Sequence, residues 1–182
     1  MFGLTPDNQS AYIGLGSNLG DRAGNLLLAV RCMMEASFDV CKLSAIYETE
    51  PWEMESDLWF LNMVAQVKLA NDISPTQMMA RLLRIEYNLG RRDKMLNLPR
   101  TIDLDLLFFG KMRLQTDFLT LPHPCAHERR FVLTPLNEIA PHLVHPGIRR
   151  TIAELLADCE DDGKVRRWHP SPSQRACVTY EP

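Results

Sequence analysis

The order in which the hydrophobic period changes along this sequence is the feature that most constrains its fold. Apolar residues recur at every second position, as in a half-buried strand, over four segments: 11–17, 42–47, 61–69 and 101–109. Two further segments, 21–36 and 74–89, have the spacing of an amphipathic helix. The resulting β-α-β-β-α-β order predicts an α+β fold. We expect a ferredoxin-like sandwich whose mostly antiparallel sheet has helices on one face and an open second face.

Signals at the helix ends support the two helical segments. Asp21 is an acidic residue where a helix begins, a position that the helix dipole favours. Ser74 followed by Pro75 combines a capping residue with a backbone angle that suits the first turn. Gly90 supplies the stop of the second helix. Both helices are therefore predicted with defined ends as well as an apolar face.

Length and local composition predict one domain. The 182 residues are enough for a single sizeable core. We expect a domain that spans 1–182, with its core over about 11–157. Helical stretches at 133–139 and 151–157 are predicted as C-terminal additions. Because charge, proline and serine prevail toward the C-terminus, a flexible tail is expected over 158–182.

Composition argues against several classes of protein. No apolar run approaches the roughly 20 residues that cross a bilayer, and the N-terminus lacks the basic and apolar blocks of a secretory signal. Five scattered cysteines without a CxxC pair suit a reducing compartment and do not suggest a disulfide framework. A net charge of -3 argues against general nucleic-acid binding. We expect a cytoplasmic monomer without membrane or nucleic-acid partners.

Two aspartates interrupt the apolar strand PRTIDLDLLFFG. Strand alternation turns Leu104 and Phe108 toward the helices and leaves Asp103 and Asp105 together on the open face, about 6.6 Å apart. Neighbouring carboxylates repel, which raises a pKa or requires a cation between them. Oxygen ligands at this spacing suit Mg²⁺, which usually takes one or two carboxylates plus substrate phosphates. The alternative is an exposed sheet face with solvated aspartates.

A basic segment precedes the acidic strand. Arg91, Arg92, Lys94 and Arg100 stand against a single acid, Asp93. Guanidinium groups beside paired carboxylates are typical of phosphoryl transfer, in which the acids hold the metal and the cations neutralise the transferred group. A solvated surface loop is the alternative, and the neighbouring carboxylates make it the weaker one.

Histidines follow in LPHPCAHERRFVL. His123, Cys125 and His127 could be proposed as zinc ligands, but the flanking prolines fix an extended backbone, so that the side chains need not converge as on a helix. Phosphate contacts from His123 and Arg129 are the simpler interpretation. A hydrolytic zinc site is therefore the less favoured alternative.

Two aromatic residues lie close in sequence to an amide near the start of the third predicted strand. Trp52 and Phe60 stand in or beside a polar loop next to Asn62. Aromatic plates beside an amide suit a flat heterocycle, although most aromatics are simply core residues. Gly14 and Gly16 on the open side of the first strand leave room above the sheet. A Rossmann fingerprint is not supported, because GLGSNLG is GxGxxxG.

Seven segments of this chain occur in an order that points to one family. They are AYIGLGSNLGDR (11–22), YETEPW (47–52), FLN (60–62), RIEYNLGR (84–91), PRTIDLDLLFFG (99–110), LTLPHP (119–124) and ERRFVLTPLNEIAP (128–141). In them the chain resembles the 6-hydroxymethyl-7,8-dihydropterin pyrophosphokinase family of folate biosynthesis. The resemblance covers about residues 11–157, and the PRTIDLD segment followed by the PH and RRFVL segments is its most specific part.

The resemblance implies transfer of pyrophosphate from ATP to the pterin hydroxymethyl group, with release of AMP. It makes Asp103 and Asp105 ligands of two Mg²⁺ ions and gives catalytic roles to these aspartates together with Arg91 and Arg100. The implied ATP contacts are Glu86, Arg91, Arg92, Arg100, Thr120, His123 and Arg129. The implied pterin contacts are the flanking rings Phe60 and Phe131, with Thr49, Asn62 and the backbone at Glu50 and Trp52.

Other function classes remain open from the residues alone. Asp93 and Leu96 stand where basic residues are common in the resembled family, which motivates a non-catalytic pterin- or nucleotide-binding paralogue as the alternative. A ferredoxin-like RNA-binding module would instead need a basic, aromatic sheet face, whereas this face is predicted to carry Asp103 and Asp105.

Overall fold

The computed structural model describes residues 9–51, 58–70, 72–91 and 98–170. Its strands are β1 (Ser10–Ser17), β2 (Asp39–Leu43), β3 (Tyr47–Thr49), β4 (Phe60–Lys68), β5 (Asp103–Phe109), β6 (Leu114–Gln115), β7 (Thr120–Leu121) and β8 (Val165–Arg167). Its helices are α1 (Arg22–Glu35), α2 (Pro75–Asn88), α3 (Arg130–Ile139) and α4 (Ile152–Ala157). The main sheet has the order β5-β1-β4-β3-β8, with β2 also paired to β4 and every described pairing antiparallel. The predicted α+β, ferredoxin-like class is confirmed.

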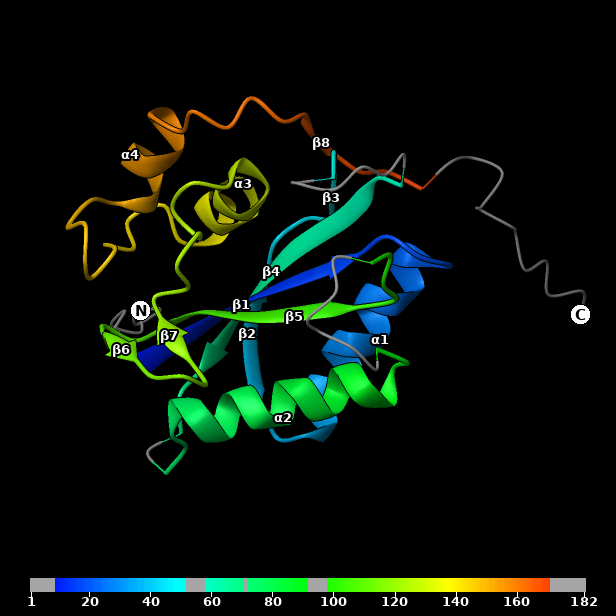
Figure 1. Cartoon of the computed structure of the whole chain (residues 1–182), viewed down its shortest axis with the longest axis horizontal. Helices are drawn as coiled ribbons and strands as arrows, with labels where there is room; N and C mark the ends of the chain where they lie inside the picture. The colour runs from blue at the N-terminus through cyan, green and yellow to red at the C-terminus, as the bar shows by residue number, and fades with distance from the viewer. Residues whose placement is uncertain (1–8, 52–57, 71, 92–97, 171–182) are drawn as a thin grey trace, which may run out of the picture.

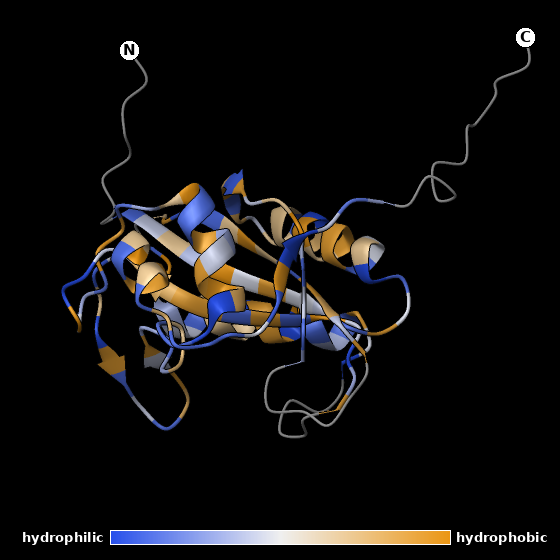
Figure 2. Cartoon of the chain, turned by 90° about the horizontal axis from the view of Figure 1, so that it is seen from above, coloured by the Kyte–Doolittle hydropathy of each residue, from blue (hydrophilic) through white to orange (hydrophobic). Residues whose placement is uncertain are grey.

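The layers are visible in Figure 1, in which α1 and α2 lie on one side of the sheet and α3 and α4 on the other. In Figure 2 the loops around the sheet are coloured mainly as hydrophilic, while hydrophobic colour is frequent along the strands. No helix in the described ranges is both long enough and apolar enough to span a bilayer.

Capping groups define the helix starts where the sequence predicts them. Asp21 caps α1, its Oδ1 accepting from the Gly24 N–H at 3.0 Å. Ser74 and Gln77 form a reciprocal capping box at the start of α2, with Pro75 in its first turn. Such caps are typically worth about 1 kcal/mol each. The helix starts are therefore defined by contacts within three residues of the chain.

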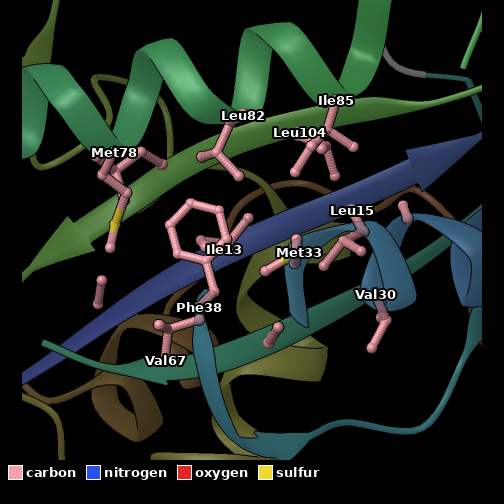
Figure 3. Close-up of a cluster of buried hydrophobic side chains, with 14 of the residues drawn as sticks. Ile13, Leu15, Val30, Met33, Phe38, Val67, Met78, Leu82, Ile85 and Leu104 are labelled. Carbon is pink, nitrogen blue, oxygen red and sulfur yellow. The ribbon is translucent and has the colours of Figure 1, made fainter. Parts of the chain in front are cut away.

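The larger core lies between the sheet and the helices α1 and α2. Ile13 and Leu104 from adjacent strands meet Leu82 of α2 and Met33 of α1, and all four are inaccessible to solvent. Figure 3 shows these side chains converging between the two helices and the strands. Burial of each such side chain contributes about 1.5–3 kcal/mol. This core fixes β1, β4 and β5, the strands that underlie the opposite face.

A second core on the opposite face corrects the predicted orientation of Phe108. The register of β1 against β5 shifts, so that Ile13 pairs with Leu106 while Tyr12 pairs with Phe108, and Leu107 is an extra residue between them. This bulge turns Phe108 away from α1 and α2. It packs with Tyr12 and Leu107 against α3 and α4 instead. The second face is therefore covered over this half by the C-terminal helices and remains open only beside it.

Two other predictions about the chain's course were wrong. The single strand expected at 42–47 is divided into β2 and β3, which pair with different parts of β4. The chain passes between them at Ser44, whose Oγ accepts from the Val64 N–H at 2.9 Å. Part of the expected tail is also ordered, because β8 pairs with β3. Residues 171–182 lie outside the described residues.

Candidate active site

A cavity of about 230 Å³ opens on the sheet face beside α3. It gathers side chains from β1, β3, β4, β5, the segment before β5, the turn after β7 and the start of α3. The residues that line it include most of those implied for the site: Thr49, Glu50, Phe60, Asn62, Arg91, Arg100, Asp103, Asp105, His123, Arg129 and Phe131. Thr120 and Glu86 do not line it, and Trp52 and Arg92 lie outside the described residues.

The paired carboxylates lie as strand alternation predicts. Asp103 and Asp105 line the cavity from β5 and are half-buried, whereas Leu104 between them is wholly buried in the core. Across the sheet they face Gly16 and Gly14 of β1. The missing side chains of these glycines leave the space above the carboxylates to a ligand.

Gly16 also marks a close approach within the site. A Cβ at this position would lie 2.7 Å from the Oδ1 atom of Asn62, whereas one at Gly14 would meet Leu107 at an ordinary 3.5 Å. Only at the first of these positions would an added Cβ force a neighbour, the Asn62 amide, to move.

A buried ion network fixes the acidic strand. The Arg91 Nη1 donates to Glu86 Oε1 at 2.8 Å and to Asp103, and Arg100 pairs with the other oxygen of Asp103 at 2.9 Å. Burial opposes the charge on Arg91, but the carboxylates of Asp103 and Glu86 outweigh it and raise its pKa. The Arg91 guanidinium therefore stays charged at the edge of the cavity.

Glu86 belongs to this network but does not line the cavity. It is 2% exposed on α2, and its Oε1 also accepts from the backbone N–H of Leu104 at 2.7 Å. The carboxylate thus ties α2 both to Arg91 and to the start of β5. Direct contact of Glu86 with a nucleotide stays a prediction, as it does for Thr120 on β7.

Two further basic residues, His123 and Arg129, line the same cavity. His123 follows β7, where its N–H donates to the Leu107 carbonyl at 2.9 Å, and Arg129 immediately precedes α3. The guanidinium of Arg100 lies 5.1 Å from the centroid of Phe60, and that of Arg129 lies 5.8 Å from the centroid of Phe131. The cavity therefore combines two acids with several cations and two rings, a composition suited to a metal-bound polyphosphate beside a flat molecule.

The other end of the cavity holds an amide and a hydroxyl. Asn62 is 8% exposed, and its Nδ2 donates to the Oγ1 of Thr49 at 2.7 Å. The backbone N–H of Glu50 donates to the Lys164 carbonyl at 3.2 Å. A backbone contact from Glu50 to a ligand would therefore have to come from its carbonyl.

The histidine cluster has no zinc geometry. In the described ranges, no three His, Cys, Asp or Glu side chains are grouped so that they could hold a metal ion on their own. His127 instead packs edge-on against His145, with ring centroids 5.6 Å apart. The oxygens of Asp103 and Asp105 remain the donor pair that fits a metal, and they fit Mg²⁺ completed by phosphate oxygens and water.

Sequence reasoning missed two contributors to the site. Asn18 accepts from the Arg100 N–H at 2.7 Å through its Oδ1, and its own N–H donates to the Arg100 carbonyl at 3.1 Å. Its place in a polar turn after a strand was the only available signal. Lys164, which binds Glu50, was missed because it lies in the segment expected to be a flexible tail.

Comparisons with known proteins agree with these features. The profile of the family described as 7,8-dihydro-6-hydroxymethylpterin-pyrophosphokinase (HPPK) matches residues 12–141. A Methylorubrum extorquens protein named 2-amino-4-hydroxy-6-hydroxymethyldihydropteridine pyrophosphokinase is 40% identical over 86% of this chain and 97% of its own. A Bacillus subtilis protein of the same name is 43% identical over 72% of this chain and 78% of its own.

Longer proteins match as well. The Dictyostelium discoideum protein named Folic acid synthesis protein FOL1 is 31% identical over 91% of this chain, which spans only 25% of that protein. Among solved structures, wild-type Plasmodium falciparum HPPK-DHPS matches with a TM-score of 0.65 at 17% identity. That match covers 82% of this chain and 44% of the other. It supports the fold alone.

Proposed function

Because this chain belongs to the 7,8-dihydro-6-hydroxymethylpterin-pyrophosphokinase family, we propose that its cavity transfers pyrophosphate from ATP to the hydroxymethyl group of 6-hydroxymethyl-7,8-dihydropterin. The products are the pterin diphosphate and AMP, in a step of folate biosynthesis. The observation that carries this proposal is one cavity in which Asp103 and Asp105 lie with the guanidinium groups of Arg91 and Arg100, next to Asn62, Thr49 and two phenylalanines.

Asp103 and Asp105 are the residues proposed to hold Mg²⁺, with two ions expected. Bound there, the metal neutralises and orients the phosphates of ATP. The fit rests on two oxygen donors on one strand face and on the glycines opposite them, which leave room for phosphate. Asp103 pairs with Arg91 and Arg100, which hold its two oxygens in place at the cavity.

The cationic residues bind the polyphosphate. Arg91 and Arg100 reach the acidic pair directly, and His123 and Arg129 line the same cavity, so all four are proposed to contact phosphate oxygens. Arg92, Thr120 and Glu86 complete the proposed ATP contacts. Phosphoryl transfer needs positioning and charge neutralisation and no protein nucleophile, which agrees with a site built from charged and aromatic groups.

The pterin is proposed to lie between Phe60 and Phe131, where its rings stack on flat apolar surfaces. Thr49 and Asn62 bind its polar edge, and the backbone at Glu50 and Trp52 supplies further contacts. This placement directs the hydroxymethyl oxygen toward the phosphates at the acidic end. The oxygen attacks the β-phosphorus, the bond between the α- and β-phosphates breaks, and the hydroxyl proton is released.

The assay that tests this function separates it from simpler reactions. Purified protein is mixed with ATP, Mg²⁺ and the hydroxymethyl pterin, and nucleotides are separated by chromatography. The proposal requires AMP in amounts equal to the pterin diphosphate, and no AMP when either pterin or Mg²⁺ is omitted. ADP as the product would instead indicate single-phosphate transfer.

A folded protein that binds pterin or nucleotide and releases no AMP would be the non-catalytic paralogue. We further propose that residues 1–182 form one domain and that the protein works as a cytoplasmic monomer without nucleic-acid or membrane partners. Analytical ultracentrifugation of the purified protein tests whether it is a monomer.

A further inference from the structure

The strand β8 lies beyond the residues that the family profile matches and pairs with β3 at one edge of the sheet. In this register Glu48 faces Arg166, and Thr49 faces Val165. We call residues 164–167 the C-terminal strap. Because β3 has only three residues and carries Thr49 at its end, the strap pairs with the part of the sheet that reaches the cavity.

Two ion pairs join the strap to β3 and the residue that follows it. Arg166 donates to Glu48 Oε2 through its Nε at 3.0 Å and its Nη2 at 2.6 Å. Lys164 donates to the two oxygens of Glu50, from its Nζ at 2.9 Å and from its backbone N–H at 3.0 Å. Burial opposes the charge on Glu48, but the bonds from Arg166 and Arg22 outweigh it and lower its pKa. Opposite charges facing each other across antiparallel strands stabilise the pairing and fix its register.

The same contacts reach the start of β4. Arg22 of α1 donates to Glu48 Oε1 at 2.9 Å and to the carbonyl of Trp59 at 2.8 Å. The guanidinium of Arg166 lies 5.0 Å from the centroid of the Trp59 ring. Glu48 on β3 and Trp59 beside Phe60 are therefore tied to each other and to the strap.

The strap also adjoins the end of the cavity assigned to the pterin. A second cavity of about 300 Å³ is lined by Thr49, Glu50 and Phe131 on one side and by the segment 161–165 on the other. Thr49, Glu50 and Phe131 also line the main cavity. A displacement of the strap would therefore move the wall that faces the pterin.

We propose that Lys164 and Arg166 are positioning residues for the pterin: through Glu50 and Glu48 they hold β3, and through Trp59 they hold the adjacent Phe60. The proposal rests on the proposed function, because it takes its substrate from there. Contacts of a binding site must be held to within about 0.5 Å, and a three-residue edge strand cannot supply that alone. The strap supplies the missing support, so its loss weakens pterin binding and leaves ATP binding nearly unchanged.

The test uses the full chain with both strap cations removed, Lys164→Ala with Arg166→Ala. The dissociation constant of the pterin is measured by titration of its own fluorescence, which needs no turnover, and the KM of ATP is measured from AMP release. We expect the pterin constant to rise about 3- to 10-fold, the size expected for two partly exposed ion pairs. The KM of ATP is expected to stay within about twofold.

Two further variants separate positioning from general destabilisation. Lys164→Arg with Arg166→Lys keeps both charges but loses the two-nitrogen donation of Arg166 to Glu48 and its contact with Trp59, so the pterin constant is expected to fall between those of the wild type and of the double alanine variant. Arg31→Ala removes an exposed ion pair with Glu35 on α1 and is expected to change neither constant. Both outcomes support a role specific to the strap.

An unchanged pterin constant in the double alanine variant would overturn the proposal. So would an equal rise in the pterin constant and in the KM of ATP, since that would indicate a purely structural effect. A wild type that binds pterin and releases no AMP would refute the proposed function alone, because the comparison of pterin constants would still decide the role of the strap.

Discussion

Replacement of Glu86 by alanine is expected to be among the most destabilising single changes in the described part of the chain. The Glu86 carboxylate is buried on α2 and accepts from both Arg91 and the backbone of Leu104. Its removal leaves a buried N–H on β5 without this acceptor. It also leaves Arg91, whose side chain is 6% exposed, with one carboxylate fewer.

The size of the effect follows from these contacts. An unsatisfied buried N–H costs about 1–3 kcal/mol, and breaking one partner of a buried ion pair costs about 3–5 kcal/mol. Because Asp103 still compensates Arg91, the full cost of breaking the pair does not apply, and we expect a total of about 3–5 kcal/mol. In a chain of this size, that lowers Tm by roughly 6–20 °C. Glu86→Gln keeps an acceptor oxygen and is expected to cost only about 1–2 kcal/mol.

Urea unfolding followed by tryptophan fluorescence measures the free energy of unfolding, with a change in midpoint at constant m as the readout. Glu35→Ala, which loses the exposed pair with Arg31, serves as the matched control and is expected to cost less than about 0.5 kcal/mol. If Glu86→Ala lowered the free energy of unfolding by no more than about 1 kcal/mol beyond the control, the network would not stabilise β5.

Three other predictions follow from the site and its surroundings. Gly16→Ala is expected to raise the pterin KM roughly tenfold, because a new Cβ 2.7 Å from Asn62 Oδ1 displaces the amide, while Gly14→Ala stays within about twofold; equal effects of the two changes would contradict this. Burial and the neighbouring His127 lower the pKa of His145 from 6.5, so the unfolded chain binds more protons and stability decreases as the pH falls below that value. His145→Asn keeps an acceptor for the N–H groups of Gly147 and Ile148. It is expected to reduce the change of Tm between about pH 7.5 and about pH 5.5. An unchanged slope would show that another group causes the pH dependence. EDTA is expected to stop AMP release and excess Mg²⁺ to restore it, whereas activity that survives chelation would rule out the role given to the carboxylates.

The parts of the structure that follow from local rules were predictable. The alternation that brings Asp103 and Asp105 to one face depends only on the two-residue period of a strand. The caps at Asp21 and Ser74 depend on side chains and backbone within three residues of each other. For these features, the sequence contains the whole physical cause.

Features set by a distant partner were not predictable in the same way. Phe108 changes face because the pairing of β5 with β1 skips Leu107, and a register shift has no signature in β5 alone. The strap has only three strand residues, Val165–Arg167, which read as a charged tail until Glu48 and Glu50 are placed opposite it. Its structure comes from a partner more than a hundred residues away.

The central claim is that the paired carboxylates on β5 organise the transfer of pyrophosphate. The most direct test compares AMP release by the wild type with that by Asp103→Asn and Asp105→Asn. Asparagine has nearly the shape of aspartate, and the folding of each variant is checked by circular dichroism. With saturating Mg²⁺, ATP and pterin, each variant is expected to lose at least about a hundredfold in kcat. A folded variant of either kind that released AMP at close to the wild-type rate would contradict the claim.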